Sequence, residues 1–327
     1  MSKNILIVVI IVAGTLAYMT WAGAPTVSNL SVAVSSVGSL EEKVLPVAGV
    51  VLPVRWGDLG AKLVKTGVID QEKFKQLYAS RGGLTAEMEA MLSGGNNDNI
   101  KITAENSGTI LNLLWALGLG SKNEILEKGP MTDKNYGGAG NFASTGGWTL
   151  AKGNAMDHYS RHQFFNLTPD QQALVERVSK GIYRPCCGNS TYFPDCNHGM
   201  AMLGLLELMA SQGASERDMY QAALAANSYW FPDTYITIAT YLKNKGVDWK
   251  DVNPQEILGV NYSSGQGYAK IASQVVTSGT GGSRGGNSCG VGAGAPVAPQ
   301  RQSSGCGVDA GQPAPVLVPK QQTGCGI

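Results

Sequence analysis

The chain carries little charge. Of its 327 residues, 15% are charged and the net charge is +1, whereas about a quarter of the residues are charged in an average soluble protein. No run of lysine and arginine alternates with aromatic residues, which argues against nucleic-acid binding. The Gly-Lys-Ser/Thr ending of a phosphate-binding loop is also missing. We therefore expect neither a nucleic acid nor a nucleotide as a partner.

Strand-length runs that alternate polar and apolar residues are scarce, so few strands are expected. Segment 50–54 is rich in β-branched residues, but no nearby segment offers it a convincing partner. Helical patterns dominate instead; one starts at Thr168, with Pro169 at its first position and Gln171 as capping-box partner, and runs to Gly181. The sequence predicts a mainly α-helical fold with a single irregular multi-helix domain. Other helices are expected at 71–78, 86–92, 109–117 (ended by Gly118 and Gly120), 199–209, 219–229 and 234–242.

A long uncharged run opens the chain. No charged residue lies between Lys3 and Glu41, and most residues up to position 21 are apolar. A bilayer-spanning helix needs about 17–25 such residues. We expect residues 1–24 to form a membrane anchor, with 4–22 in contact with the membrane, or else a cleaved signal peptide. In either case Lys3 stays inside, and the bulk of the chain lies outside the cytoplasm. We therefore expect a single-pass protein of a bacterial cell membrane.

The uncharged region ends in a predicted spacer at 25–44, followed by the helical domain at 45–276. After residue 276 the composition shifts to glycine, serine, glutamine and proline, which cannot build a core. We therefore expect 277–327 to be a disordered tail. A segment of the tail recurs nineteen residues later. Each of the two copies holds one cysteine between glycines, Cys306 in the first and Cys325 in the second.

The tail also holds Cys289, in a partial third copy of the repeat. Three thiols on a flexible tether can return to the domain that carries them. We expect Cys289, Cys306 and Cys325 to capture a metal ion or a thiol partner and to pass it to the folded domain. A low-complexity stalk that cross-links chains is the alternative.

Histidine and cysteine gather in one window of the predicted domain. All three histidines and half of the six cysteines lie between residues 158 and 198. These are the side chains that bind soft and borderline metal ions best. The sequence therefore predicts a metal site, for zinc, copper or another soft ion. Its candidate ligands are His158, His162, Cys186, Cys187, Cys196 and His198.

The spacing of the two upstream histidines suggests how they would bind one ion. If 154–165 is helical, His158 and His162 project from one face, one turn apart, as two ligands of one ion would. Tyr159 stands where a metalloprotease helix of this kind has its glutamate, so no built-in general base is expected there.

The segment 183–199 is a loop shaped by two prolines and a glycine. Cys196 and His198 stand at the start of the predicted helix 199–209, whose N-terminus favours a thiolate. Neighbouring side chains diverge, so one of Cys186 and Cys187 is expected to join Cys196.

Two other interpretations remain open. The protein is alternatively a thiol-dependent enzyme, with Cys196 as nucleophile and His162 or His198 as base, oriented by Asp157 or Asp195. A third possibility is a non-catalytic surface protein held by disulfides such as Cys187–Cys196, because the expected compartment is oxidising. A glycine-rich segment at 136–148 is expected to be a long structured connection; such segments also serve as lids over functional sites.

Overall fold

The computed structural model describes residues 39–276, and the two ends of the chain lie outside this description. The predicted membrane anchor at 1–24, most of the spacer and the tail with Cys289, Cys306 and Cys325 therefore lie outside the described residues. Between residues 39 and 276 no helix is both long and apolar enough to cross a membrane.

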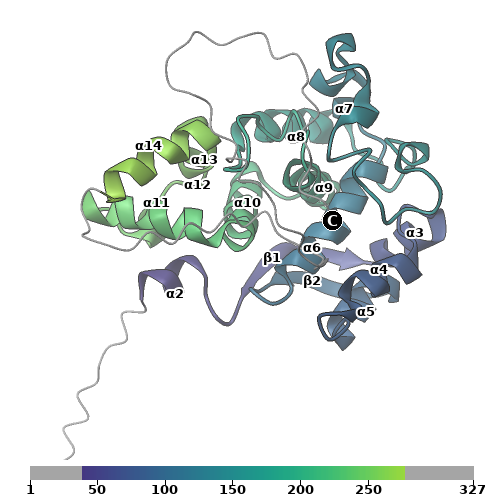
Figure 1. Ribbon diagram of the computed structural model, residues 1–327, viewed down its shortest axis with the longest axis horizontal. Coiled ribbons are helices and arrows are strands. Elements are labelled where there is room, and N and C mark those ends of the chain that lie inside the picture. Colours follow the sequence, from purple (N-terminus) through teal and green to yellow (C-terminus); the bar gives the residue numbers. More distant parts are fainter. Residues whose placement is uncertain (1–38, 277–327) are drawn as a thin grey trace, which may run out of the picture. The chain divides into compact units, whose positions relative to one another are not determined.

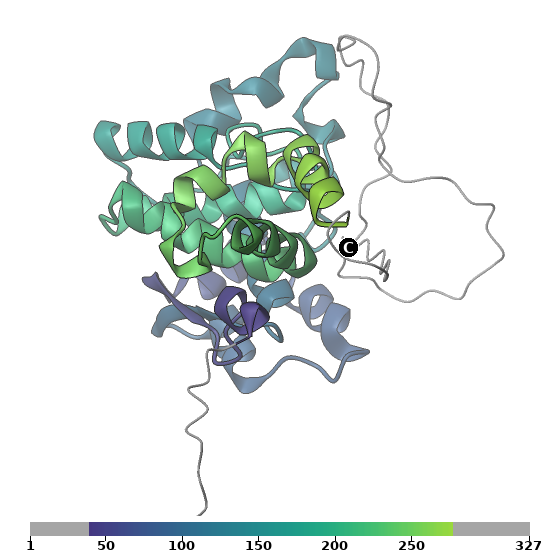
Figure 2. The same ribbon diagram turned by 90° about the vertical axis from the view of Figure 1, so that its left-hand side faces the viewer.

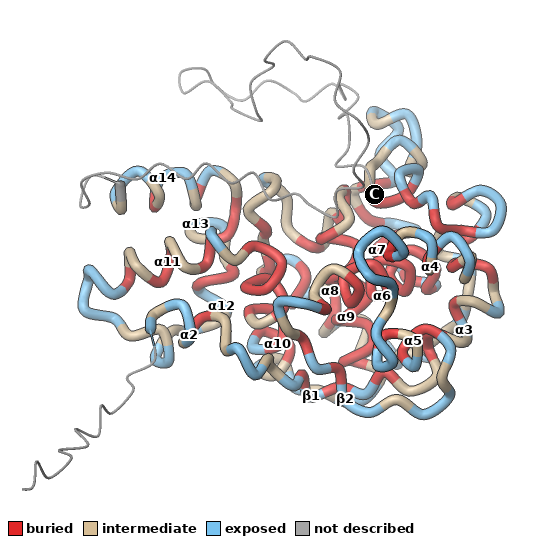
Figure 3. Tube along the Cα trace, turned by 60° about the horizontal axis from the view of Figure 1, so that its bottom comes forward, coloured by how far each residue is buried: buried red, intermediate tan, exposed pale blue. Residues whose placement is uncertain are grey.

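The described residues form a mainly helical fold, as the sequence predicts (Figure 1). The longest helices lie in the middle of the chain, and their inward faces are buried (Figure 3). The other helices lie on either side of these central helices (Figures 1 and 2). The helices are α2 (Leu40–Val44), α3 (Leu59–Thr66), α4 (Gln71–Ala79), α5 (Ala86–Ser93), α6 (Ser107–Gly120), α7 (Glu124–Lys128), α8 (Pro169–Gly181), α9 (Asn197–Ser211), α10 (Glu216–Trp230), α11 (Pro232–Asn244), α12 (Pro254–Ile257), α13 (Val260–Ser263) and α14 (Gly265–Val276), with 3-10 turns at Pro130–Thr132, Lys134–Tyr136, Ala139–Asn141, Ala155–Asp157 and Trp249–Asp251.

Helices α6 and α9 pack along each other at the centre of the fold. A Cβ atom on Gly118 would lie 2.1 Å from the carbonyl oxygen of Met200, and one on Gly204 would lie 2.4 Å from that of Leu114. The two backbones therefore approach so closely that only glycine fits at these positions. The prediction that Gly118 ends its helix is wrong, because α6 continues through it to Gly120.

The capping box predicted at Thr168 is confirmed, and other surface helices begin in a similar way. Thr168 and Gln171 form a reciprocal capping box at the start of α8. The hydroxyl of Thr85 accepts the hydrogen bond of the Met88 amide at the start of α5. Ser215 caps α10 in the same way as Thr168 caps α8. These local signals fix where the surface helices begin, because they satisfy amides that have no partner within the helix.

Two expectations about the first hundred residues are corrected. Segment 50–54 does have a partner: β1 (Val50–Gly57) pairs antiparallel with β2 (Asn97–Ile102), with Val50 opposite Ile102 and an irregularity between Val51 and Arg55. The sequence conceals β2 because it is largely polar. The last residues of the predicted spacer form α2, which packs against α11 and buries Val44. The folded domain therefore begins before residue 45.

Candidate metal and thiol site

The loop between α8 and α9 is held at several points. Tyr183 and Ser190 pair as an antiparallel bridge, which closes the loop at its base. The amide of Tyr183 donates to the carbonyl of Leu258 across 2.8 Å. The amide of Gly265, the first residue of α14, donates to the carbonyl of Cys187 across 2.9 Å. These contacts fix the cysteines of the loop relative to the helices on both sides.

Arg184 lies at the centre of this loop and is almost completely buried. Its Nε donates to the Sγ of Cys196 across 2.9 Å. Its Nη1 donates to the carbonyl of Asn189 across 3.1 Å, and its Nη2 donates to that of Phe193 across 2.9 Å. Nη2 also forms an ion pair with Asp195. A buried guanidinium with all of these acceptors fixes the shape of the loop.

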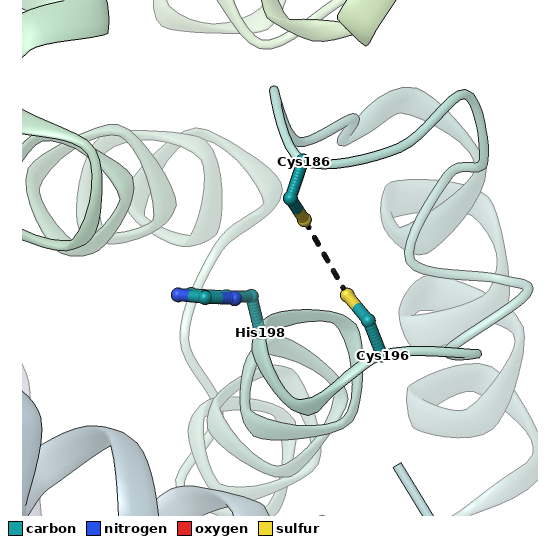
Figure 4. A group of neighbouring side chains, drawn as sticks. All are labelled: Cys186, Cys196 and His198. Carbon is teal, nitrogen blue, oxygen red and sulfur yellow. Dashed lines mark hydrogen bonds between the residues drawn. The ribbon is translucent and has the colours of Figure 1, made fainter. Parts of the chain in front are cut away.

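The thiols of Cys186 and Cys187 lie close to that of Cys196. The Sγ atoms of Cys186 and Cys196 are 3.6 Å apart and point toward one another (Figure 4). Cys187 is directed to Asp195 instead, with 3.9 Å between its Sγ and Oδ1. All three cysteines are half-buried free thiols. The predicted disulfide Cys187–Cys196 is therefore not formed in this structure, and Cys186 faces Cys196 directly.

His198 lies on the first turn of α9, one residue after its start. Its ring contacts those of Phe231, with centroids 4.4 Å apart, and Trp230. In Figure 4 the ring extends to the side of the helix away from the Cys186–Cys196 contact. Its Nδ1 is buried and has no hydrogen-bond partner among residues 39–276. A buried nitrogen without a partner is costly, by about 1–3 kcal/mol, unless something binds it.

The thiols differ in acidity because of their neighbours. Hydrogen bonds from Cys186 and Cys187, together with the charge of Arg184, hold the pKa of Cys196 well below its usual value in spite of burial. Hydrogen bonds to Cys187 and Cys196, together with burial, raise the pKa of Cys186 well above its usual value. The pKa of Cys187 is about 12, because its hydrogen bond to Cys186 lowers it less than its hydrogen bond to Cys196 and burial raise it. Cys196 is therefore the most acidic thiol of the group.

Two overlapping sets of donors could hold a metal ion among the described residues. Cys186, Cys196 and His198 each offer one ligand atom, and these three atoms lie within 4.8 Å of one another. Cys187, Asp195 and Cys196 form the second set within the same limit. Cys196 belongs to both sets. The structure thus brings four of the six predicted ligands together, and it adds Asp195 to them.

The other two predicted ligands lie in neither set. His158 and His162 do not share a helix, because the 3-10 turn ends at Asp157 and the chain then changes direction at Ser160, whose φ is +51°. The helix proposed for 154–165 is therefore wrong. The two rings still meet: 3.1 Å separates Nδ1 of His158 from Nε2 of His162. Asp157 takes part in a local capping box with Asn154.

The glycine-rich segment 136–148 packs against the cysteine loop. The rings of Tyr136, Phe142 and Phe193 form a cluster, with centroids 5.3 to 5.5 Å apart. The amide of Ser144 donates to the carbonyl of Asp195 across 3.3 Å. The segment is therefore a structured connection that supports the loop from one side.

The sequence reasoning missed Arg184, which contacts Cys196 and Asp195 together. The signal was available: a single arginine stands just before Pro185 and the two adjacent cysteines. Comparison with known protein families, with curated proteins and with solved structures finds no match to this chain. The function is therefore argued from the site itself.

Proposed function

We propose that this protein binds a soft or borderline metal ion through Cys186, Cys196 and His198. The observation that carries the proposal is that His198, whose buried Nδ1 has no hydrogen-bond partner among residues 39–276, belongs to the same donor group as two thiols. Such a nitrogen gains a partner when a metal ion binds. Thiolate and imidazole together suit zinc and copper rather than calcium or magnesium.

The separation of the two sulfurs supports this proposal. Two thiolates at about 2.3 Å from a tetrahedral zinc ion lie about 3.8 Å apart. The Sγ atoms of Cys186 and Cys196 are 3.6 Å apart, so little movement is needed to place an ion between them. The buried charge of Arg184 favours a thiolate on Cys196, which is the form that binds metal.

The donor set has three members, and this restricts the ion. Copper(I) is satisfied by a few soft ligands, whereas zinc needs a fourth ligand. Cys187 is the nearest additional thiol, since it shares the second set with Cys196. We therefore propose zinc or copper, and leave the fourth position of zinc to Cys187 or to water.

Metal content tests the proposal. The full chain, purified under reducing conditions, is expected to carry about one zinc or copper ion, measured by mass spectrometry. The double variant Cys196→Ser, His198→Ala is expected to bind at least about 100-fold more weakly. His158→Ala is the matched control, because His158 lies in neither donor set. Metal-free parent protein, or equal loss in the control, would refute the assignment.

The wider role follows from the predicted ends of the chain. We propose that residues 4–22 anchor the protein in a membrane with its bulk outside the cytoplasm, and that Cys289, Cys306 and Cys325 pass the ion to Cys196. Truncation after Thr277 tests the relay: slower transfer from a copper(I) or zinc chelate to the site supports it, whereas an unchanged transfer rate refutes it.

A further inference from the structure

Two thiols that face each other can also exchange electrons. The Sγ atoms of Cys186 and Cys196 are 3.6 Å apart. A disulfide bond joins two sulfurs at about 2.05 Å. Closing the bond therefore brings the two sulfurs roughly 1.5 Å closer together. Both residues are half-buried and keep part of their surface in contact with solvent.

The surroundings distinguish Cys196 from the other thiols. Nε of Arg184 donates to its Sγ across 2.9 Å, and that donor cannot turn away, because the remaining donors are held by Asn189, Phe193 and Asp195. A fixed cation beside a sulfur stabilises negative charge on it, whether that sulfur attacks or leaves.

Cys187 has a different environment, although it neighbours Cys186 in the chain. Its Sγ lies 4.0 Å from the carbonyl oxygen of Asn189 and 3.9 Å from the carboxylate of Asp195. An acidic neighbour opposes charge on this thiol. The two adjacent cysteines therefore differ, and Cys186 is the one that faces Cys196.

We propose that Cys186 and Cys196 form a dithiol–disulfide couple that exchanges with accessible disulfides, with Cys196 as the attacking sulfur and Cys186 as the resolving one. This activity goes beyond metal binding and does not depend on it. The disulfide form would lack both sulfur ligands of the proposed ion, so oxidation and metal binding exclude each other.

The chemistry balances with an external disulfide, R–S–S–R, as the oxidant. The Cys196 thiolate attacks one sulfur; a Cys196–S–R bond forms, and the other half leaves as a thiolate that takes a proton from water. Cys186 gives up its proton to water and attacks the Sγ of Cys196; the Cys186–Cys196 bond forms, the Cys196–S–R bond breaks, and the second half leaves as a thiolate that takes a proton from water. Two electrons pass from the protein dithiol to the external disulfide, which is reduced to two thiols.

The test uses the full chain with Cys289, Cys306 and Cys325 replaced by serine, reduced and then freed of metal with a chelator. Oxidised glutathione is the probe, and peptide mapping by mass spectrometry is the readout. The expected product is a single Cys186–Cys196 disulfide. In Cys186→Ser the reaction is expected to stop at a glutathione adduct on Cys196. Cys187→Ser is the matched control and is expected to form the same disulfide within about twofold of the parent rate.

Several outcomes would overturn the proposal. One is a disulfide to Cys187 in the parent chain. Another is glutathione capture at Cys186 in Cys196→Ser that is as fast as capture at Cys196 in Cys186→Ser; we expect the latter to be faster by on the order of tenfold. A third is no product in a chain that circular dichroism shows to be folded. Because the chelator is present throughout, these results are independent of the metal-content assay, and either proposal can fail alone.

Discussion

Arg184 donates one hydrogen bond to the sulfur of Cys196 while it forms an ion pair with Asp195. The same cation therefore fixes the loop and sets the charge state of the sulfur that every donor set contains. Burial raises the pKa of Asp195, and Arg184 opposes that shift. Taking away one partner of a buried pair leaves an uncompensated charge. Structure and reactivity are coupled at this position, so a probe of the site should keep the charge of Arg184 and change only the position of its guanidinium.

Gly199→Ala is such a probe. A Cβ atom at this position would lie 2.6 Å from Cζ of Arg184. We expect the free energy of unfolding of the variant to be about 1–3 kcal/mol lower than that of the parent, because the guanidinium must move away from its acceptors. Alanine is otherwise favoured over glycine in helices by about 1 kcal/mol, so the predicted sign is opposite to that of helix propensity.

Urea unfolding followed by circular dichroism measures the effect of Gly199→Ala. Gly188→Ala is the control: it lies in the loop that contains Arg184, is exposed, and a Cβ there would have nothing within 4 Å. Equal stability of the two variants, or a stabilised Gly199→Ala, would show that the guanidinium is not held as described.

Local signals in the sequence predicted more of the fold than long-range ones. The capping box of Thr168 and Gln171 is predicted correctly because it depends only on residues three positions apart. The strand β2 is missed because pairing with β1 depends on a chain segment some forty residues away. Gly118 is misread because a glycine that ends a helix and one that admits a neighbouring helix are the same residue in a sequence.

The residues of the candidate site also divide into those that the nearby sequence predicts and those that depend on the rest of the fold. Cys186, Cys196 and His198 are close in the sequence, and the structure brings them together. Including His158 and His162 required a helix that a capping box at Asn154 and a left-handed residue at Ser160 replace. Arg184 is missed because an arginine usually lies at the surface, and nothing in its own chemistry predicts its burial.

A buried carboxyl in α9 gives a prediction about pH. Glu207 is almost completely buried, and its oxygens have no hydrogen-bond partner among residues 39–276. Burial raises its pKa well above 4.5, although the nearby Ser121 and Asn123 favour the charged form. The folded protein thus holds this proton more tightly than the unfolded chain does. Stability from Glu207 is complete below pH 4.5 and is lost as the pH rises through the raised pKa.

Glu207→Gln removes that loss, because the amide does not ionise. We expect the variant to become more stable than the parent with rising pH, by at least about 1 kcal/mol at alkaline pH. Urea unfolding at several pH values gives the difference, with Glu87→Gln, at an exposed position of α5, as control. A difference that does not depend on pH would mean that Glu207 is ionised in the folded protein.

The histidine pair has the opposite pH dependence. Nε2 of His158 faces the carbonyl of Lys152 at 2.9 Å and must carry a hydrogen, so its Nδ1 accepts the hydrogen bond of His162. Burial, then His158, then Arg161 lower the pKa of His162 below 6.5. Its contribution to stability is present above pH 6.5 and is lost as the pH falls through the lowered pKa.

His162→Gln keeps a donor at this position but does not titrate in this range. We expect the variant to lose less stability than the parent on acidification, by under about 1 kcal/mol, because His162 is partly exposed. The proton resonances of the His162 ring give its pKa directly. A measured pKa above 6.5 would contradict the neutral pair, since a protonated His162 would then be favoured.

Metal binding and thiol exchange compete for the same sulfurs, and the competition is measurable. With zinc or copper(I) bound, we expect Cys186 and Cys196 to resist both iodoacetamide and oxidised glutathione, because each sulfur shares its lone pair with the ion. Cys187 is the internal reference: if water completes the zinc site, its labelling stays unchanged, and if Cys187 is the fourth ligand, it becomes protected as well. Labelling of all three thiols at the metal-free rate in a chain shown by mass spectrometry to carry its ion would place that ion elsewhere. Protection of Cys196 alone would retain its central role and would exclude Cys186 as a ligand.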